Sequence, residues 1–320
     1  MRHVFIINPA AGKGRAMELI PFIEDYFKGK SEEYIIKVTE YPGHATFIAR
    51  EYSQERACRI YSLGGDGTVN EIVNGIAGTN ASLGIIPAGS GNDFLRSIYP
   101  EYGIREMIVD TIIGEERSID LARANEKFFI NISSVGFDAE VVYNALKFKK
   151  LPGVTGSMAY LFSLVYTIFR NKINEVKINI DGSEIRLRIL LAAIANGRFY
   201  GGGMLPVPSA RLDDGLLDMC LVREVSRLKI LNLFPKYMKG NHGQIEEVSF
   251  HKAKKIKIES RDSISLNVDG EIMTAKVIDF EILSNAIKII YPAERSSSGG
   301  FSEVSSPADN TPESNQIVNF

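Results

Sequence analysis

Apolar residues in the first 115 positions fall into short runs that alternate with stretches of helical spacing. The short runs predict strands over residues 3–7, 34–38, 59–63 and 82–86. Apolar residues recur every three or four positions over 16–27, 45–52 and 69–76, and again after the fourth strand as far as residue 113. Strands and helices that alternate in this way predict a doubly wound, parallel α/β sheet.

The pattern changes near residue 117, beyond which strand-like runs dominate. They predict strands over 118–125, 127–137, 175–181, 184–196, 216–224, 254–259, 263–271, 275–283 and 286–292. Helical spacing interrupts them near 158–170 and 228–238. Many short strands with few helices are typical of a mainly antiparallel β-sandwich or barrel. We therefore expect an α/β domain over 1–120 and a β-sandwich domain over 121–293.

Composition narrows the class of protein. The chain has 320 residues, enough for two domains with a core each, and residues 294–320 are rich in Ser, Pro, Asn and Gly, which predicts a disordered tail. A net charge of −2 argues against a nucleic-acid partner. Two cysteines, Cys58 and Cys220, form no disulfide framework, so we expect a cytoplasmic protein. The apolar stretch 151–169 contains Pro and Gly and is too short to span a bilayer, so a buried or interfacial helix is expected there.

Glycine-rich loops follow two of the expected strands, GGDGT at 64–68 and PAGSGNDF at 87–94. Glycine at a strand-to-helix corner lets a ligand phosphate approach the backbone and the helix N-terminus, although a simple turn is the alternative. The stretch NPAAGKG at 8–14 is not a Walker motif, because Gly14 stands where Ser or Thr would hold magnesium. It also lacks the third glycine of the dinucleotide fingerprint, as does the stretch around Asp66.

A carboxylate inside a phosphate loop requires a cation, because Asp66 and a phosphate repel each other in a low-dielectric cleft. Mg²⁺ between them attracts both, and it prefers a few carboxylates together with water and substrate phosphates. Asp93 and Asp120 follow at equal intervals (93 − 66 = 27 and 120 − 93 = 27), about one strand–helix unit each. We therefore expect the three to converge at one sheet edge. The alternatives are a helix N-cap for Asp93 and an exposed strand charge for Asp120.

Seven stretches occur in order between residues 7 and 271: INPAAGKG, TEYPGHA, GGDGTVNEIVNG, IPAGSGNDF, NGRFYGGGM, LDDGLLD and NVDGE. Together they resemble the diacylglycerol kinase catalytic family, specifically its soluble bacterial lipid kinases, and more distantly sphingosine and ceramide kinases. The resemblance implies an NAD-kinase-like α/β domain followed by a β-sandwich, with a nucleotide site between them. GGDGT alone is shared with NAD kinases, whereas the whole set is specific.

The resemblance also implies roles for single residues. ATP would be held by Asn8, Pro9, Ala10, Ala11, Gly12, Thr39, Gly64, Gly65, Asp66, Gly67, Thr68, Val69, Asn70 and Ser90. Asp66, Asp93 and Asp120 match an acidic, water-linked network that serves the catalytic Mg²⁺. A second, structural Mg²⁺ would bind the Asp214 carboxylate and the carbonyls of Arg211 and Leu216, and Glu271 matches the general base. From the residues alone, DDG at 213–215 is a turn and DG at 269–270 is a type I′ hairpin, which would still present Glu271 at a cleft.

The expected activity is Mg²⁺-dependent transfer of the γ-phosphoryl group of ATP to a lipid hydroxyl. Diacylglycerol is the expected acceptor, with phosphatidylglycerol, a sphingoid base or a ceramide as open alternatives. The rival enzyme is an NAD kinase, a class that carries a Thr-Gly-Ser-Thr-Ala-Tyr stretch. The nearest string here, VTGSMAY at 154–160, has Met158 where Thr would stand and lies in different surroundings, and the SGNDF loop also argues against this enzyme. A third hypothesis is an inactive nucleotide sensor or lipid-transfer protein, which the presence of Glu271 and the three aspartates argues against.

A lipid kinase without a membrane span must meet its acceptor at a membrane, so we expect a peripheral contact at the inner face, with a homodimer as an open possibility. The stretch KFKKLPG at 147–153, beside an apolar helix, would suit anionic headgroups. The charge pattern alone favours the other interpretation, a solvated charge run before a core helix. HKAKKIKIE at 251–259 indicates a half-exposed strand.

Overall fold

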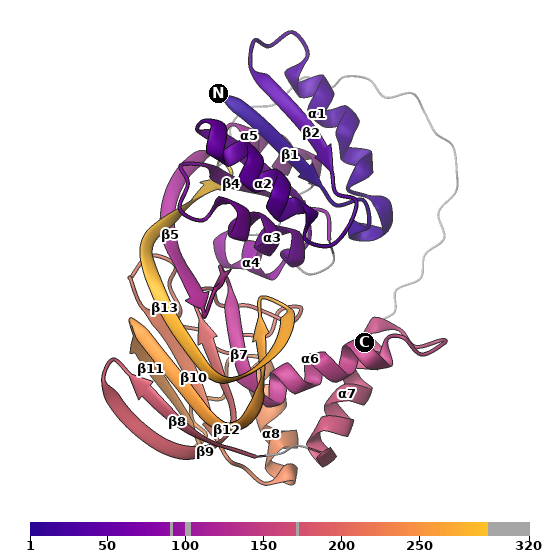
Figure 1. The fold of residues 1–320 in the computed structure, drawn as a ribbon. Helices are drawn as coiled ribbons and strands as arrows, with labels where there is room; N and C mark the ends of the chain where they lie inside the picture. The colour runs from indigo at the N-terminus through magenta and orange to yellow at the C-terminus, as the bar shows by residue number, and fades with distance from the viewer. Residues whose placement is uncertain (90–91, 100–103, 171–172, 294–320) are drawn as a thin grey trace.

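The computed structural model of the chain describes residues 1–89, 92–99, 104–170 and 173–293, which form two stacked parts (Figure 1). In the N-terminal part, four parallel strands lie in the order β2-β1-β3-β4. They are β1 (Arg2–Ile7), β2 (Glu33–Val38), β3 (Cys58–Gly64) and β4 (Ser82–Pro87). The helices are α1 (Ile20–Phe27), α2 (His44–Glu55), α3 (Asp66–Ile76), α4 (Asp93–Ile98) and α5 (Ile104–Ile112), and two 3₁₀ turns, Ala11–Gly14 and Met17–Leu19, precede α1. The predicted doubly wound α/β domain is confirmed.

Both faces of this parallel sheet are buried, which explains why its strands are continuous apolar runs in the sequence. Alternate residues of β1 point to opposite sides. Val4 and Ile6 pack with α2 and α3 on one face, and Phe5 and Ile7 pack with α1 and α5 on the other. All four side chains are fully buried.

The C-terminal part is a β-sandwich covered by helices, as predicted. Its strands pair antiparallel with one another. They are β5 (Glu115–Ala124), β6 (Lys127–Phe129), β7 (Ile132–Gly136), β8 (Asn174–Ile180), β9 (Ser183–Ala195), β10 (Leu217–Arg223), β11 (Val248–Ala253), β12 (Lys255–Val268) and β13 (Glu271–Tyr291). One apolar core fills the interior of the sandwich, and a second lies between the sheet and the helices α6 (Phe137–Phe148), α7 (Gly156–Arg170) and α8 (Arg227–Met238).

This part differs from the sequence prediction in several places. The strand expected over 127–137 is two strands, β6 and β7, and β11 was not predicted as a separate strand. The pairs of strands expected over 254–259 and 263–271, and over 275–283 and 286–292, are each one long strand, β12 and β13. Both contain a register shift, between Glu259 and Ile264 and between Leu283 and Ile287, and these irregularities looked like strand ends in the sequence. Helix α6 was not predicted, because the apolar run that ends at Phe137 masks the start of a helix there.

The last strand returns to the N-terminal part. Lys288 and Ile289 of β13 pair in parallel with Ser82 and Leu83 of β4, while β5 pairs antiparallel with β13 along most of its length. Figure 1 shows β13 as one curved ribbon that passes from the lower sheet to the upper one. Because β5 and β13 run through both parts, the domain boundaries 1–120 and 121–293 stay a prediction. The predicted tail, 294–320, lies outside the described residues.

No helix within the described residues is long and apolar enough to cross a membrane. The stretch 151–169 instead supplies most of α7, which packs against α6 and α8.

Gly75 is expected to be intolerant of a side chain, because α2 and α3 pack closely there. A Cβ at Gly75 would lie 2.6 Å from the Thr46 carbonyl oxygen and 2.8 Å from Ala49 Cβ. Gly75→Ala should therefore lower the free energy of unfolding by about 1–3 kcal/mol, even though Ala favours helices. Urea denaturation measures this. Gly67→Ala in the same helix, whose Cβ meets no described atom within 4 Å, is the control, and equal effects of the two variants would contradict the close packing.

Candidate active site

The loops that follow β1, β3 and β4 touch one another at the carboxyl edge of the N-terminal sheet. A Cβ at Gly12, where φ is +59°, would lie 2.1 Å from the carbonyl oxygen of Ala88. A Cβ at Gly89 would lie 2.6 Å from the Cα of Gly65. These glycines are therefore required by the approach of one backbone to another, which brings three loops of the sequence into one surface.

Side-chain hydrogen bonds fix the same surface. Asn8 Nδ2 donates to Thr68 Oγ1 at 3.2 Å, Asn8 Oδ1 accepts the Ala10 N–H at 3.0 Å, and the Thr39 N–H donates to the Ile7 carbonyl at 2.8 Å. The structure thus gathers the predicted nucleotide residues 8–12, 39 and 64–70 at one edge. Ser90, also predicted there, lies outside the described residues.

Asp66 holds the N-terminus of a neighbouring helix. Although it is the first residue of α3, its carboxylate accepts the backbone N–H groups of Asp93 at 3.1 Å and Phe94 at 3.2 Å, which begin α4. A carboxylate at this position neutralises the positive end of the helix dipole. Asp66 therefore stabilises the start of α4, whether or not it also binds a cation.

Asp93 is not the N-cap that was the alternative for it. Asn92, in the left-handed region at φ +53°, precedes α4, and Asp93 turns its carboxylate to the next domain. There it accepts the Gly202 N–H at 2.6 Å and forms an ion pair with Arg96 at 3.1 Å. Burial raises the pKa of Asp93 above its usual range, and the negative charge of Asp66 raises it further. The structure therefore brings Asp66 and Asp93 together as two like charges.

Asp120 lies elsewhere. Its carboxylate accepts the N–H groups of Gly215 at 2.6 Å and Asn285 at 2.9 Å, beside the loop 211–216. The equal spacing of the aspartates suggested two strand–helix units, but β5, which carries Asp120, runs antiparallel to β13 and does not extend the parallel series. The structure does not bring Asp120 into contact with Asp66 or Asp93.

The hairpin between β12 and β13 has the predicted tight turn. Asp269 and Gly270 both have positive φ, +46° and +96°, as a type I′ turn requires. Glu271 follows directly, half exposed, with its carboxylate in an ion pair with Lys127. The turn thus presents Glu271 at the junction of the two parts.

The Asp269 carboxylate joins the two parts. It accepts the backbone N–H groups of Ile130 at 2.8 Å, Asn131 at 3.2 Å and Ile132 at 2.9 Å, together with Nδ2 of Asn70 on α3 at 3.1 Å. Burial raises the pKa of Asp269 to about 6. Sequence reasoning took this residue only as a turn former, because its partners lie 137–139 and 199 positions away.

A cavity of about 260 Å³ lies between the glycine loops and the sandwich. Its lining comes from both parts and is mainly apolar, with carboxylates at its rim: Asp66, Val69, Asp93, Phe94, Ile130, Asn131, Ile132, Asp138, Val142, Tyr160, Tyr200, Gly201, Gly202, Met204, Asn267, Asp269 and Gly270. The NGRFYGGGM stretch forms a loop on this cavity. It requires its three glycines because Gly201, Gly202 and Gly203 all have positive φ.

Sequence reasoning missed Asp138, a buried acid of α6 that lines the cavity. Its carboxylate accepts the Tyr200 hydroxyl at 2.7 Å, and Tyr200 in turn lies 3.1 Å from the Tyr237 hydroxyl. Burial raises the pKa of Asp138 to about 6. Its partner Tyr200 lies 62 positions away, and its partner Ala139 lies in a helix that was not predicted, so no local pattern identified it.

A magnesium ion with a nucleotide fits the Asp66–Asp93 edge. No three His, Cys, Asp or Glu side chains among the described residues are grouped as an all-protein metal site. Mg²⁺ nevertheless requires only one or two carboxylates when water and substrate phosphates supply its other ligands. Burial and, less strongly, the charge of Asp66 raise the pKa of Asp93, so a cation between the two carboxylates and the phosphates would stabilise both charges.

The second magnesium site, at Asp214, does not fit. Its Oδ1 accepts the Leu216 N–H at 3.2 Å, and its Oδ2 is paired with the Lys252 ammonium at 2.7 Å. Lys252 also lies 3.0 Å from Asp218. Burial alone would lower the pKa of Lys252, but the two carboxylates outweigh it and raise that pKa. The position that the resemblance assigns to a metal already holds a cation from the chain itself.

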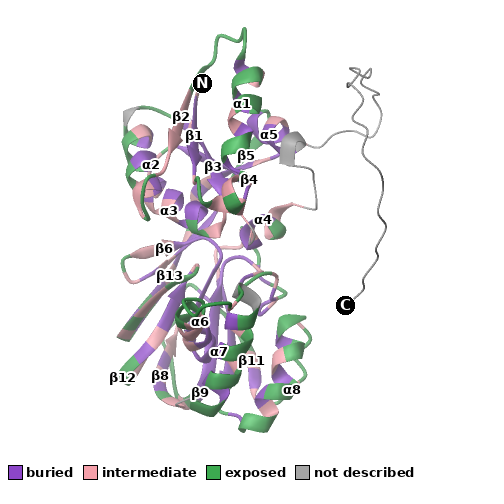
Figure 2. Ribbon diagram, turned by 90° about the vertical axis from the view of Figure 1, so that its right-hand side faces the viewer, coloured by how far each residue is buried: buried purple, intermediate pink, exposed green. Residues whose placement is uncertain are grey.

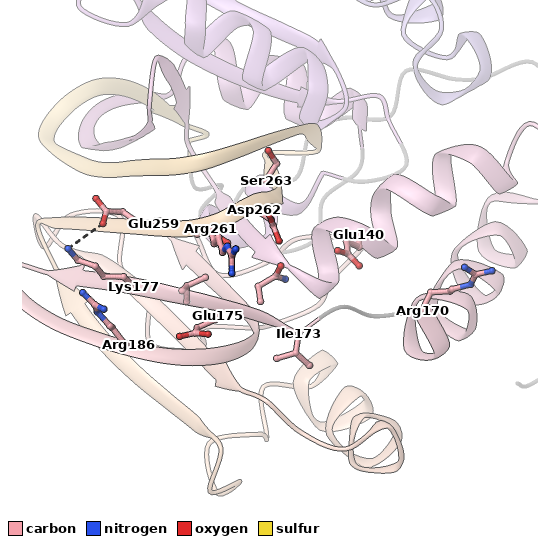
Figure 3. Close-up of a pocket in the computed structure, with 13 residues that line it drawn as sticks. Glu140, Arg170, Ile173, Glu175, Lys177, Arg186, Glu259, Arg261, Asp262 and Ser263 are labelled. Carbon is pink, nitrogen blue, oxygen red and sulfur yellow. Dashed lines mark ion pairs between the residues drawn. The ribbon is translucent and has the colours of Figure 1, made fainter.

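A larger and more open hollow, of about 960 Å³, lies on the far side of the sandwich (Figure 3). Charged side chains line it, including Glu175, Arg186 and Glu259, with an ion pair between Lys177 and Glu259. None of the predicted site residues lines it, so size alone does not identify the active site.

Comparison with known proteins divides the chain into the same two parts. Residues 2–124 match the model of the diacylglycerol kinase catalytic domain, and residues 131–291 match that of the YegS C-terminal NAD kinase beta sandwich-like domain. A diacylglycerol kinase of Mycobacterium tuberculosis is 33% identical, with 90% of this chain and 94% of that protein covered. One of Bacillus subtilis is 28% identical, at 91% and 96% coverage. The crystal structure of a putative diacylglycerol kinase from Bacillus anthracis superposes with a TM-score of 0.72 at 26% identity, over 91% of this chain and 97% of the other.

Because Lys252 is paired with Asp214, the stability of the loop 211–216 should not depend on Mg²⁺. Lys252→Met leaves Asp214 and Asp218 unpaired, so this variant should melt at a lower temperature and regain stability when Mg²⁺ is added. The double variant Lys252→Met/Asp214→Asn should lose that gain. Thermal unfolding across a Mg²⁺ titration measures both. If the wild type gains as much from Mg²⁺ as Lys252→Met does, and Asp214→Asn abolishes the gain, a metal binds at the loop after all.

Asp138 should make the folded protein less stable as the pH rises from about 4 to 6. Its pKa is raised to about 6 from a usual value of 3.8, so in this range the folded state binds more protons than the unfolded state, and the free energy of unfolding falls with pH. The full penalty, at most about 3 kcal/mol, is present above the folded pKa. Asp138→Asn removes the ionisation and keeps an acceptor for the Tyr200 hydroxyl.

The measurement is the melting temperature of both proteins between pH 4 and 7.5. Relative to the wild type, the variant should become more stable as the pH rises, and titration of Asp269, which both proteins share, cancels in the difference. A difference that is constant with pH would contradict the buried ionisation.

Proposed function

The chain belongs to the diacylglycerol kinase catalytic family, a family of lipid kinases, and we propose that it transfers the γ-phosphoryl group of ATP to a hydroxyl group of a membrane lipid. Diacylglycerol, which would give phosphatidic acid, is the acceptor we propose first. The names of the relatives in Mycobacterium tuberculosis and Bacillus subtilis support this choice. The use of ATP fits a cytoplasmic protein at the inner face of the membrane.

One observation carries the proposal: carboxylates next to the glycine loops and apolar side chains line the same cavity. Asp66 and Asp93 suit a nucleotide phosphate with its cation, and Phe94, Ile132 and Met204 suit an acyl chain. The apolar wall therefore favours a lipid over NAD as the acceptor.

Phosphoryl transfer needs positioning and charge neutralisation more than covalent chemistry. Backbone N–H groups of the loops at 8–12 and 64–68, together with the N-terminus of α3, would hold the phosphates. The Mg²⁺ that accompanies ATP supplies neutralisation of the charge on the transferred group. Asp66 and Asp93 would fix its place at the loop edge, and the bond from Asp93 to Gly202 keeps the acceptor side aligned with the phosphates.

Glu271 is the carboxylate that we propose as general base. Asp66 and Asp269 already direct their oxygens to backbone N–H groups, two for Asp66 and three for Asp269, which fixes these carboxylates in structural roles. Glu271 forms an ion pair with Lys127 and remains half exposed, beside Gly270 of the cavity wall. Release from Lys127 would free the Glu271 carboxylate to take the proton of an acceptor hydroxyl.

The test of the function is transfer of labelled phosphate. The protein is incubated with γ-labelled ATP, Mg²⁺ and mixed micelles that contain diacylglycerol, phosphatidylglycerol, a sphingoid base or a ceramide, with NAD as a separate acceptor. Label in diacylglycerol supports the full proposal, and label in another lipid corrects only the acceptor. Label in NAD would identify the rival enzyme, and label in none of them would contradict a kinase.

Glu271→Gln should lower kcat by about 10²–10⁴-fold, the usual contribution of a positioned general base. Gln keeps the shape of the side chain but cannot take the hydroxyl proton. KM for ATP should stay nearly unchanged, because the loops of the other domain hold the nucleotide. Steady-state kinetics with a phosphorylated lipid measure this.

The matched control is Glu281→Gln. Glu281 lies on the same strand and is also in ion pairs, with Arg123 and Lys255, but not on the cavity. It should keep wild-type kinetics. A kcat for Glu271→Gln within a few-fold of the control would mean that the base is another residue.

A further inference from the structure

A second cavity, of about 340 Å³, takes its lining from both parts of the chain. Ser97 near the end of α4, residues 117–119 of β5 and Tyr291 of β13 form it together with the loops at 197–198 and 210–213. Figure 1 and Figure 2 both show α4 at the lower end of the N-terminal part, where it meets the sandwich. This cavity shares no lining residue with the one that holds Asp66 and Asp93, so it is a separate place on the molecule.

Arginine dominates the charged lining of the second cavity. Arg117, Arg198 and Arg211 line it with a single acid, Asp213, which gives the lining a net charge of +2 (3 − 1 = 2). The whole chain carries a net charge of −2, so this positive charge is local. Like charges gathered around a cavity repel one another, and an anion between them relieves that repulsion.

The acidic partners of two of these arginines are weak. Arg211 lies 3.3 Å from Asp213, and the two side chains are 67% and 59% exposed. Arg117 lies 3.6 Å from Glu115, which is not part of the lining, and these side chains are 60% and 81% exposed. Solvent screens ion pairs as exposed as these, so they contribute little and leave both guanidinium groups available to a stronger acceptor.

Arg198 has no acidic partner within the part of the chain that the structure describes. Its Nη2 donates to the Ser97 carbonyl at 3.3 Å, and its guanidinium carbon lies 5.7 Å from the centre of the Phe199 ring. A guanidinium carries five N–H donors, so most of those of Arg198 remain for a ligand. Half-buried, this side chain is held in place by the protein without being neutralised by it.

Ring contacts also hold Arg117 ready for a ligand. Its guanidinium carbon lies 4.7 Å from the centre of the Tyr291 ring. An arginine stacked in this way loses less side-chain freedom on binding, and its planar fork donates two parallel hydrogen bonds to a phosphate. The lining therefore combines charge with donors that are already arranged.

We propose that the second cavity is a binding site for inorganic phosphate or a phosphate monoester, held by the guanidinium groups of Arg117, Arg198 and Arg211. A phosphate monoester carries a charge of about −1.5 to −2 at pH 7 and three strong acceptor oxygens, which matches a lining of three guanidinium groups with net +2. A phosphodiester or a carboxylate has one charge and two free oxygens, so it would leave one guanidinium group without a partner.

The proposed site lies behind the active-site loop. Asp93, at the start of α4, accepts the Gly202 N–H at 2.6 Å, and Ser97, near its end, accepts the Arg198 N–H through Oγ at 3.2 Å. Helix α4 and the loop 197–202 are thus joined at both ends. A phosphate between Arg198 and Arg117 adds a link from this loop to β5, so its binding should slow hydrogen exchange of the backbone amides at 197–202.

Isothermal titration calorimetry at constant ionic strength, without ATP, Mg²⁺ or a lipid acceptor, tests the site with glycerol 3-phosphate. Arg117→Gln and Arg198→Gln should each weaken binding about tenfold, and the double variant on the order of 10²-fold, because each removes a charge-assisted fork. Arg198→Lys keeps the charge and loses the fork, so it should restore only part of the affinity. Phosphate bound at the glycine loops of the other cavity would not respond to these substitutions.

The matched control is Arg186→Gln, since Arg186 is 74% exposed and lines the hollow of Figure 3. It should bind like the wild type, and melting curves should show every variant folded. Equal affinity in the wild type, Arg117→Gln and Arg198→Gln would overturn the proposal, as would no binding up to about 10 mM. A loss in Arg186→Gln as large as in Arg198→Gln would also overturn it, because net charge alone would then explain the effect.

Three phosphate compounds distinguish the sources of the ligand: inorganic phosphate, glycerol 3-phosphate and the short-chain lipid dihexanoyl phosphatidic acid. Similar affinities for all three support a site for the phosphate group alone, and tighter binding of the lipid supports a lipid headgroup as the source. The phosphodiester dihexanoyl phosphatidylglycerol should bind more weakly, and equal binding would overturn the assignment to a monoester. No phosphoryl transfer enters these measurements, so they stand whether or not the proposed function does.

Discussion

The buried carboxylate of Asp269 is the constraint on which the arrangement of the site depends. Three consecutive N–H groups at 130–132 and the amide of Asn70 all donate to it, so one side chain positions the β12–β13 hairpin, the strand that enters the sandwich and helix α3 of the other domain. A buried charge is tolerated only when it is satisfied in this way, and removal of the partners would leave a costly unpaired group. The hairpin that carries Glu271 is therefore fixed relative to the glycine loops.

The carboxylates of the cleft illustrate how one residue type performs several tasks. Asp66 caps α4, Asp93 joins α4 to the loop of Gly202, Asp269 joins the domains, and Asp120 holds the loop near Gly215. Each is satisfied by backbone N–H groups, which favour the ionised form and offset part of the penalty of burial. Two carboxylates at the Asp66–Asp93 edge are consistent with our proposal that the glycine loops bind a phosphate that arrives with a cation.

Local patterns in the sequence predicted the elements well, and long-range pairing was where they failed. Continuous apolar runs such as 3–7 identify strands buried on both faces, and the glycine loops follow from the corner that a parallel strand makes with its helix. The return of β13 to β4, the place of Asp120 and the role of Asp269 depend on contacts between residues more than a hundred positions apart, for which a single sequence has no signal. Helix α7 exposes Leu161 and Phe169, and hydrophobicity alone does not say which apolar side chains of a helix are buried.

The account rests on a nucleotide held by the backbone of the loops at 8–12 and 64–68, opposite the Asp269 hairpin. Hydrogen exchange of backbone amides, measured with and without Mg²⁺ and a non-hydrolysable ATP analogue, tests this most directly. The account predicts slower exchange in both loops and at the start of α3, and little change in the hollow of Figure 3, around 175–186 and 259–263. Unchanged exchange in both loops, or protection confined to that hollow, would contradict it.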